Sequence, residues 1–398
     1  MKIDPIKRAL ELRKTIINDE KLLVTNFEDT LQGKDTSKVI DIMPNVFTGD
    51  KVFRTKFNIK ELDPIASEVY HTEFFDVRKH TNAEIENFVK SKEFDFPLWF
   101  KHTDDEFSMK KICNYVAPFI YQVGGCNFND GSETGGCWYC FVDNQSNDGV
   151  VCNGKTYIQS NESILSMVHA RKQIKETYKK RGMDVKLKVM RVSGGEPTIA
   201  LDWILEMWRS IQKNKLDFVG QIDSNLSTGQ IVDYFEKKEI FEKDTLEQLA
   251  KYPVKVLAAV KGTDMKNMQS NVQAKTTMKD QLYSLEKFIN AGFDVYPQMY
   301  NPNPKTIEKY LSQMDKKIDG FSIKTHIGPL KIYSPTKQRL TLYAKQLGIE
   351  PEQYIQQKKT EWDNNYSEGC KILDSYLQKN HGIPYKEIPR PDIKLRVN

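Results

Sequence analysis

Residues 115–126 read Tyr115-Val-Ala-Pro-Phe-Ile-Tyr-Gln-Val-Gly-Gly-Cys126, an apolar run that ends directly at two glycines and a cysteine. Aromatic and β-branched residues favour extended chain, and glycines end such runs. We therefore predict a strand that leads into a loop. From about residue 113 onwards, short apolar runs alternate with amphipathic segments, and the preceding residues show no comparable pattern.

This alternation predicts the fold class, which is α/β. We expect strands over residues 115–123, 185–192, 218–222, 254–260, 293–298 and 321–326, with helices such as 161–181, 201–211, 282–289 and 307–314 between them. Strands separated by helical crossovers must run parallel, in an open doubly wound sheet or in a full or partial barrel. In all of these folds the active-site rim is formed by loops at the carboxyl ends of the strands.

Length and composition predict one large domain with additions at both ends. The 398 residues are 39% hydrophobic, enough for a full-sized core. We assign residues 113–335 to the main domain, residues 1–112 to an α-rich N-terminal extension, and residues 336–398 to a helical C-terminal extension. The prolines after residue 383 favour extended chain there.

Charge and hydropathy bound the surroundings in which the chain works. Its 59 basic and 54 acidic residues are well mixed and give a net charge of +5, a weak indication of an anionic partner. No apolar stretch approaches the length needed to span a bilayer, and the first residues lack a signal-peptide pattern. We expect a soluble, cytoplasmic protein without a membrane partner, whose six cysteines serve as metal ligands or free thiols.

Three of these cysteines, Cys126, Cys137 and Cys140, form a C-x10-C-x2-C pattern on a loop with five glycines between residues 124 and 136. Soft thiolates on so permissive a backbone can converge on one metal centre. Three ligands favour a four-iron cluster with one open iron, because a structural zinc site normally has four protein ligands. A zinc knuckle completed by Cys152, Cys113 or a histidine is the alternative.

A second motif, Gly194-Gly195-Glu196-Pro197, follows the second predicted strand. Taken together with the cysteine loop, it makes residues 113–330 resemble the radical S-adenosylmethionine superfamily. That family binds an iron–sulfur cluster on the loop after its first strand and the methionine end of its cofactor near a GGEP-type turn. Its usual first spacing is C-x3-C, and only a minority of members have a gap as long as the one here.

The resemblance implies a partial (β/α)6 TIM-like barrel, a [4Fe-4S] cluster held by the three cysteines, and S-adenosylmethionine as cofactor. Reductive cleavage of that cofactor would yield a 5'-deoxyadenosyl radical that abstracts hydrogen from an unidentified substrate. The electron would come from a flavodoxin- or ferredoxin-like donor. The implied cofactor contacts are Tyr139, Gly194, Gly195, Glu196, Pro197, Asn225, Ser227 and Lys261.

Several of these assignments have a structural alternative. Asn225 and Ser227 could instead cap the helix that begins near Thr228, and Lys261 could face solvent. Gln298, Lys324 and His326 end later predicted strands and would face the substrate. We interpret Cys113, Cys152 and Cys370 as packing residues.

Two functions of different classes follow. The first is a radical enzyme, whose substrate could be a peptide, a tRNA nucleoside, a lipid or a small metabolite, with the basic balance slightly favouring a macromolecule. The second is a zinc-stabilised nucleic-acid-binding protein, which requires a fourth clustered ligand and interleaved basic and aromatic residues.

Overall fold

The computed structural model describes residues 3–25, 30–32, 40–44, 51–55, 57–58, 74–75, 119–152, 155–179, 188–388 and 393–398. Their main feature is a sheet in which six strands lie in the order β7-β9-β10-β11-β12-β14. All neighbours in this series are parallel. The strands are β7 (Phe119–Val123), β9 (Val189–Gly194), β10 (Val219–Ser224), β11 (Val254–Val260), β12 (Asp294–Tyr300) and β14 (His326–Gly328).

The sheet is α/β and follows the chain order of a (β/α)6 unit, as predicted. Among the described residues, β14 pairs with β12 and with no strand from the other side of the series, so the barrel is partial and open. Helices connect consecutive strands, and parallel strands require such crossovers. They are α6 (Ser160–Lys179), α7 (Leu201–Lys213), α8 (Gly229–Lys237), α9 (Thr245–Ala250), α10 (Met265–Asn271), α11 (Met278–Asn290), α12 (Pro304–Asp315) and the short α13 (Phe321–Lys324).

Side chains alternate between the two faces of the sheet. Val192, Ile222 and Val256 belong to the large apolar core, together with helix residues such as Trp208 and Leu285. The intervening positions point to the opposite, inner face and are mostly polar, namely Gln122, Arg191, Ser193, Gln221, Asp223, Lys255, Tyr296 and Gln298. The outer face therefore holds the domain together, and the inner face carries mostly polar groups.

Residues 3–25 are an integral part of this structure. Helix α1 (Pro5–Ile16) starts at Asp4, whose carboxylate accepts hydrogen bonds from the amides of Ile6 and Lys7. The chain then forms β1 (Ile17–Asn18) and β2 (Lys21–Thr25). Strand β2 pairs antiparallel with β7 and with β8 (Lys155–Ile158), which extends the sheet beyond the six-stranded series.

Shorter strands complete the description of the N-terminal part. Strand β5 (Phe57–Asn58) pairs parallel with β7, and a small separate sheet has the order β4-β3-β6. Its strands are β3 (Ile40–Pro44), β4 (Lys51–Thr55) and β6 (Phe74–Phe75). The boundary that we place at residue 112 stays a prediction.

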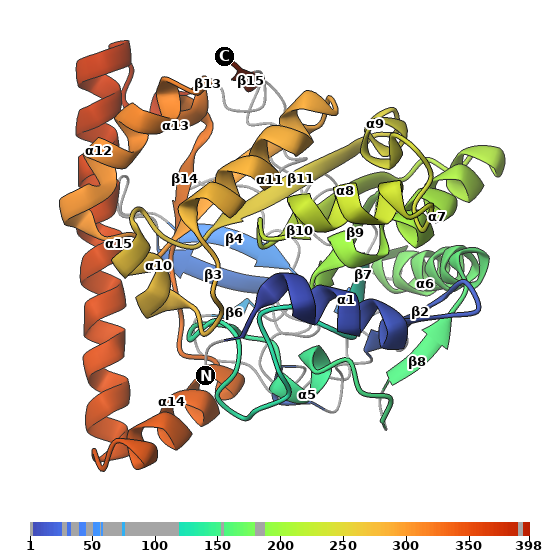
Figure 1. Cartoon of the computed structure of the whole chain (residues 1–398), viewed down its shortest axis with the longest axis horizontal. Coiled ribbons are helices and arrows are strands. Elements are labelled where there is room, and N and C mark those ends of the chain that lie inside the picture. The colour runs from blue at the N-terminus through green and yellow to red at the C-terminus, as the bar shows by residue number, and fades with distance from the viewer. Residues whose placement is uncertain are drawn as a thin grey trace.

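The C-terminal residues form the predicted helices. Helix α14 (Ser334–Gln346) and the long α15 (Pro351–His381) pack against each other, and α15 also packs along α12 (Figure 1). The chain ends with η2 (Tyr385–Glu387) and with β15 (Arg396–Val397), which pairs with β13 (Ile318–Asp319). None of the described helices is both long and apolar enough to cross a membrane.

The sixth predicted strand is wrong over most of its length. Residues 321–324 form α13, which begins after Gly320 in a left-handed conformation, and the strand starts only at His326. Phe321, Ser322 and Lys324 are all buried, so the alternation of apolar and polar letters did not reflect two faces of a strand. The other predicted strands agree with β7, β9, β10, β11 and β12 within a few residues, although residues 115–118 and 185–187 lie outside the described part.

Candidate metal and cofactor centre

The cysteine loop, residues 124–149, is fastened to its surroundings by backbone hydrogen bonds. It leaves β7 at Gly124, and the Cys126 amide donates to Asn147 O at 2.8 Å, which brings the two ends of the loop together. The amide of Trp138 donates to Asn271 O at 3.1 Å, and that of Gln273 donates to Gly136 O at 2.9 Å. Side chains of the loop also form a second apolar cluster, with Phe128, Trp138 and Tyr139 among its buried members.

Two glycines close the long gap between the first two cysteines. Gly131 and Gly136 have φ angles of 87° and 95°, in the left-handed region that other residues rarely adopt. Asn129 Oδ1 accepts a hydrogen bond from the Gly131 amide at 2.7 Å, which stabilises the first turn. The ten-residue gap is thus a folded loop with specific turns, and not merely a longer spacer.

Each of the three thiols has a side-chain donor beside it. Asn225 Nδ2 lies 3.9 Å from Cys126 Sγ, and Asn147 Nδ2 lies 3.9 Å from Cys140 Sγ. The ammonium group of Lys261 hydrogen-bonds the Cys137 thiol. Donors of this kind stabilise thiolate sulfurs and influence the properties of a bound metal centre.

The thiols are close enough to affect one another. Burial, followed by the neighbouring Cys137 thiol, raises the pKa of Cys126 well above its ordinary value. Burial also raises the pKa of Cys137, which Lys261 opposes and Cys140 reinforces. The metal-free protein therefore keeps these two thiols protonated, and a bound metal would have to displace their protons.

These residues fit an iron–sulfur cluster. The donor set is three soft sulfurs, all free of disulfides, in one buried neighbourhood. Among the described residues, no three Cys, His, Asp or Glu side chains are arranged as ligands of a single metal ion.

The second motif, residues 194–197 or the GGEP turn, contacts the cysteine loop directly. The Glu196 amide donates to Gly125 O at 2.8 Å, and the Gly195 amide donates to Val123 O at 3.1 Å. A Cβ on Gly195 would lie 1.9 Å from Gly125 O, so only glycine permits this approach. Gly195 is therefore required by the contact between the two loops.

Glu196 connects the GGEP turn to the next strand. Its carboxylate is fully buried and accepts from the Asn225 amide at 2.7 Å and from Ser224 Oγ at 3.1 Å, with a further bond from Thr198 Oγ1 at 2.5 Å. Pro197, also buried, starts the short helix η1 (Pro197–Ala200). Burial raises the pKa of Glu196, and the hydrogen bond from Thr198 acts against that rise.

Asn225 continues the network into the cysteine loop. Its Nδ2 donates to Asn127 Oδ1 at 2.8 Å, and Asn127 Nδ2 donates to Ser227 Oγ at 2.8 Å. Asn225 Oδ1 accepts from the Ser227 amide at 3.1 Å, so an Asx turn is present as well. The alternative of a helix cap is not seen, because α8 starts after Thr228 without a side-chain cap.

Lys261 is buried beside the thiols, and our alternative of a solvent-facing lysine is wrong. The residue is only 7% exposed. Its Nζ lies 5.7 Å from the ring centroid of Tyr139 and 5.5 Å from that of Tyr300. No carboxylate among the described residues forms an ion pair with it. Burial alone would lower the pKa of Lys261, but the neighbouring Cys137 and tyrosine groups raise it overall.

Tyr139, immediately before the third cysteine, stacks on Tyr300 with centroids 5.7 Å apart. Its hydroxyl is buried without a hydrogen-bond partner in the described part of the chain. Burial raises the pKa of Tyr139, so the group is a neutral hydroxyl that can donate or accept. A buried polar group of this kind favours a ligand that supplies the missing partner.

The residues predicted to face the substrate belong to the last two strands of the series and to α13. Gln298 and His326 are register partners on β12 and β14. Lys324 forms an ion pair with Asp294 at the start of β12, so it lies at the opposite end of the sheet, and its expected place at the substrate side is wrong.

Two of the three remaining cysteines belong to the described residues. Cys370 is buried in α15, as a packing residue should be, whereas Cys152 is exposed and is not one. Cys113 lies outside the described residues.

Sequence reasoning missed several neighbours of the cysteines. Arg339 of α14, only 2% exposed, donates to Cys140 O at 2.9 Å and to Val142 O at 3.2 Å, and Thr336 Oγ1 donates to Cys140 O at 3.0 Å. Asn127 and Asn147 were missed as well. No spacing signal marks these residues, because Arg339 is 199 positions from its partner Cys140.

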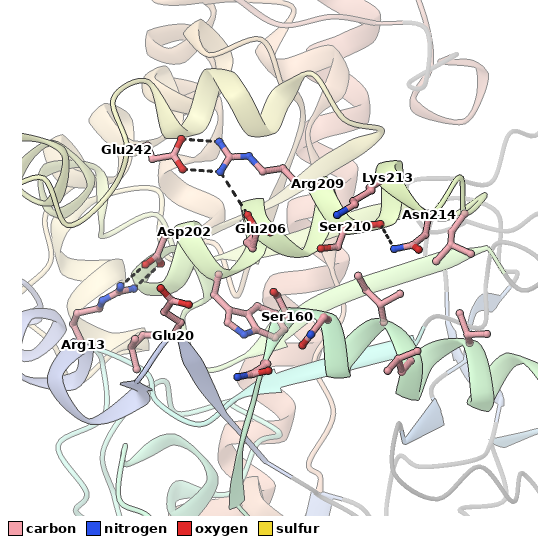
Figure 2. A pocket seen from close by; sticks show the side chains of 18 residues that line it. Arg13, Glu20, Ser160, Asp202, Glu206, Arg209, Ser210, Lys213, Asn214 and Glu242 are labelled. Atoms are coloured by element: carbon pink, nitrogen blue, oxygen red, sulfur yellow. Dashed lines mark hydrogen bonds and ion pairs between the residues drawn. The ribbon is translucent and has the colours of Figure 1, made fainter.

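A pocket of about 940 Å³ lies elsewhere, between α6 and α7 (Figure 2). Arg13 and Asp202 form an ion pair at one end of the pocket. Arg209 donates from Nη1 and Nη2 to the two carboxylate oxygens of Glu242. None of the cysteines or GGEP residues lines it. Its charged groups are largely paired with one another.

No model of a known protein family matches this sequence, and no curated protein is significantly similar to it. Solved structures with partial likeness include TYW1 with a lysine-pyruvate adduct bound, at 10% identity and a TM-score of 0.34, over 61% of this chain and 68% of that one. The cobalamin-dependent S-adenosylmethionine radical enzyme OxsB with aqua-cobalamin bound matches at 11% identity and 0.35, over 75% of this chain.

The structure of anSMEcpe with bound AdoMet matches at 17% identity and a TM-score of 0.33, over 56% of this chain. The chain spans 42% of OxsB and 55% of anSMEcpe. All of these TM-scores are below 0.5, so the function proposed below rests on the residues of this chain.

Proposed function

We propose that this chain is a radical S-adenosylmethionine enzyme in which Cys126, Cys137 and Cys140 hold a [4Fe-4S] cluster. One observation carries the proposal, namely the junction between the cysteine loop and the GGEP turn. Glu196 binds Gly125 through its amide and Asn225 through its carboxylate, and the Asn225 side chain reaches Cys126 Sγ. Two motifs about sixty residues apart in the sequence are therefore in direct contact, which supports one shared site.

When bound, the cluster and S-adenosylmethionine would supply one-electron cleavage of the sulfonium and a 5'-deoxyadenosyl radical that takes hydrogen from a substrate. A flavodoxin- or ferredoxin-like protein would donate the electron. In this proposal Lys261 supplies a buried positive charge for an anionic group of the cofactor. Tyr139 offers its unpaired hydroxyl, and Gly194, Gly195 and Pro197 form the rim of the same site.

The inner face of the sheet supports a substrate site next to this centre. Ser193 Oγ and Gln221 Nε2 donate to opposite oxygens of the Asp223 carboxylate at 2.6 Å and 2.8 Å, and Arg191 Nε donates to it at 2.6 Å. This cluster lies on β9 and β10, the strands that lead to the GGEP turn and to Asn225. A polar substrate is therefore favoured over an apolar one.

The test is anaerobic purification or reconstitution, with iron and sulfide counted per chain. The protein should be brown, with a visible spectrum that dithionite bleaches, and it should release 5'-deoxyadenosine from S-adenosylmethionine under reduction. Cys126→Ala, Cys137→Ala and Cys140→Ala should each abolish cluster content and nucleoside release. Cys152→Ser is the matched control, because its thiol is exposed, and it should behave as the wild type.

Two outcomes would overturn the proposal. A cysteine variant that keeps wild-type iron content and nucleoside release would show that the thiol is not a ligand. Colourless protein with one zinc per chain would instead support the nucleic-acid-binding alternative, for which no described set of four ligands exists.

A further inference from the structure

Helix α1 comes from the N-terminal residues whose role the sequence left open, and it lies against the cysteine loop (Figure 1). Leu12 of this helix approaches Gly125 and Gly149 so closely that a Cβ on them would lie 2.9 Å and 2.3 Å from Leu12 Cδ2. These two glycines mark the start and the end of the loop. Helix α1 is therefore packed where the two ends of the loop meet.

One side chain of α1 binds both ends of the loop at once. Arg8 Nε donates to Asn129 O at 2.9 Å, and Arg8 Nη2 donates to Asp148 O at 2.6 Å. Its side chain is 19% exposed, and its remaining charged neighbour on the helix is Glu11 at 3.7 Å. The segment between the two carbonyls contains Cys137 and Cys140.

Glycine-rich loops lose much conformational freedom when they fold, so an ordered loop of this kind needs external contacts. A planar guanidinium presents its donors in a fixed fork and can hold two carbonyls in one geometry, whereas a lysine offers a single ammonium group on a flexible stem. We propose that Arg8 is a positioning residue that closes the cysteine loop and thereby preorganises Cys137 and Cys140. The statement about metal retention rests on the proposed function, whereas the statement about loop closure does not.

A second arginine on the same helix provides a matched control. Arg13 donates to Ile199 O at 2.9 Å. It also forms an ion pair with Asp202 at the start of α7, which Figure 2 shows. Arg13 therefore fastens α1 to the α7 side of the domain, and no contact of its side chain with the cysteine loop is found among the described residues. Arg13→Ala should weaken the domain without opening the loop.

The experiment compares Arg8→Ala, Arg8→Lys and Arg13→Ala with the wild type. Hydrogen exchange of the metal-free proteins, followed by mass spectrometry, should show amides in residues 127–149 exchanging about tenfold faster or more in Arg8→Ala, since bonds from charged donors are strong and local openings govern exchange. Peptides from β11 should be unchanged. Loop exchange in Arg8→Lys should be intermediate between that of the wild type and that of Arg8→Ala, because we expect the lysine to reach one of the two carbonyls.

A second measurement follows iron release to a chelator from the reconstituted proteins, which should be about tenfold faster in Arg8→Ala than in Arg13→Ala. Equal loop exchange in Arg8→Ala and Arg13→Ala would overturn the inference. Arg8→Lys replaces Arg8→Ala if the latter does not fold, and wild-type loop exchange in it would likewise count against the inference. If the wild type takes up no iron, the proposed function fails, and the exchange of the metal-free proteins still decides the role of Arg8.

Discussion

Two buried lysines lie at opposite ends of the sheet in contrasting surroundings. Lys324 contacts the Asp294 carboxylate and Ile393 O, and its Nζ lies 4.1 Å from the ring centroid of Tyr296. Lys261 lies among two tyrosine rings and the Cys137 thiol, without an ion-paired carboxylate in the described structure. Burial lowers the pKa of Lys324, whereas the neighbours of Lys261 raise the pKa of that amine.

The difference separates a structural charge from one that is available to a ligand. An ion is costly to bury unless it is paired, and the fold pairs Lys324 internally. Lys261 instead has the rings of Tyr139 and Tyr300 and the Cys137 thiol beside it, and that thiol would become anionic if it bound a metal. We therefore expect substitutions near Lys324 to change stability and substitutions of Lys261 to change activity.

The largest effect on stability is expected at Asp294, the partner of Lys324. Asp294→Ala would leave Lys324 buried without its partner and Lys255 without its 3.0 Å contact. Breaking one side of a buried pair costs about 3–5 kcal/mol, so the free energy of unfolding in urea should fall by about that amount. A loss below about 1 kcal/mol would remove the distinction between the two ends.

Lys261→Met should change activity strongly and stability little. Removal of a preorganised charge at a reaction centre typically costs about 100-fold or more in rate, so 5'-deoxyadenosine release should fall by that factor. The free energy of unfolding should change by less than about 1 kcal/mol, since an apolar side chain of similar volume replaces an unpaired charge. A variant that unfolds readily yet keeps its activity would make Lys261 a second structural lysine.

Gly195→Ala tests whether the centre around Lys261 depends on close contact between the cysteine loop and the GGEP turn. The added Cβ would meet Gly125 O at 1.9 Å and force the loops apart, which overpacking studies place at about 1–3 kcal/mol of stability. Iron retention should fall as well. Gly382→Ala is the control for backbone strain without a clash. Gly382 has a left-handed φ of 69° but open space around it at the end of α15, so this variant should retain iron like the wild type.

A surface pair gives the smallest effect and the baseline. The pair is Asp217 with Arg171, 2.7 Å apart. Partial burial of the Asp217 carboxyl acts to raise its pKa, but the guanidinium of Arg171 lowers it overall. A carboxyl whose pKa is lowered on folding stabilises the protein at pH values above its pKa in the unfolded chain, which is 3.8. This stabilisation is lost as the pH falls below 3.8. Asp217→Asn should therefore destabilise by about 0.2–1 kcal/mol at pH 7. Thermal melts at pH 7 and pH 3 check this, and an equal loss at both would refute the assignment.

The parts of the fold that sequence could predict are those encoded by local alternation. The run Val254 to Val260 matches β11 residue for residue, because its neighbours in the chain alone mark its ends. The run 321–326 failed because Gly320 turns the chain into a short helix with buried side chains, two of which contact C-terminal residues, Ser322 with His381 and Lys324 with Ile393. Burial of that kind depends on distant partners and leaves no local trace.

The same contrast holds for the site. Cysteine spacing and the GGEP letters identify groups that carry chemistry of their own. Arg8, Asn127 and Arg339 bind backbone or amide atoms that are 121, 98 and 199 positions away. Any residue can offer a carbonyl, so a sequence does not show which one a donor will reach.

Arg339 and Thr336 have a practical consequence for anyone who trims this protein. Both lie beyond residue 335, where composition suggests that the main domain ends, yet both hold the carbonyl of Cys140. A shortened fragment that stops at this boundary would keep Cys126, Cys137 and Cys140 and every strand of the series, but it would lose the two hydrogen bonds to the carbonyl of the third cysteine. Expression fragments for crystallisation or spectroscopy should therefore include α14, together with α15, which packs against it.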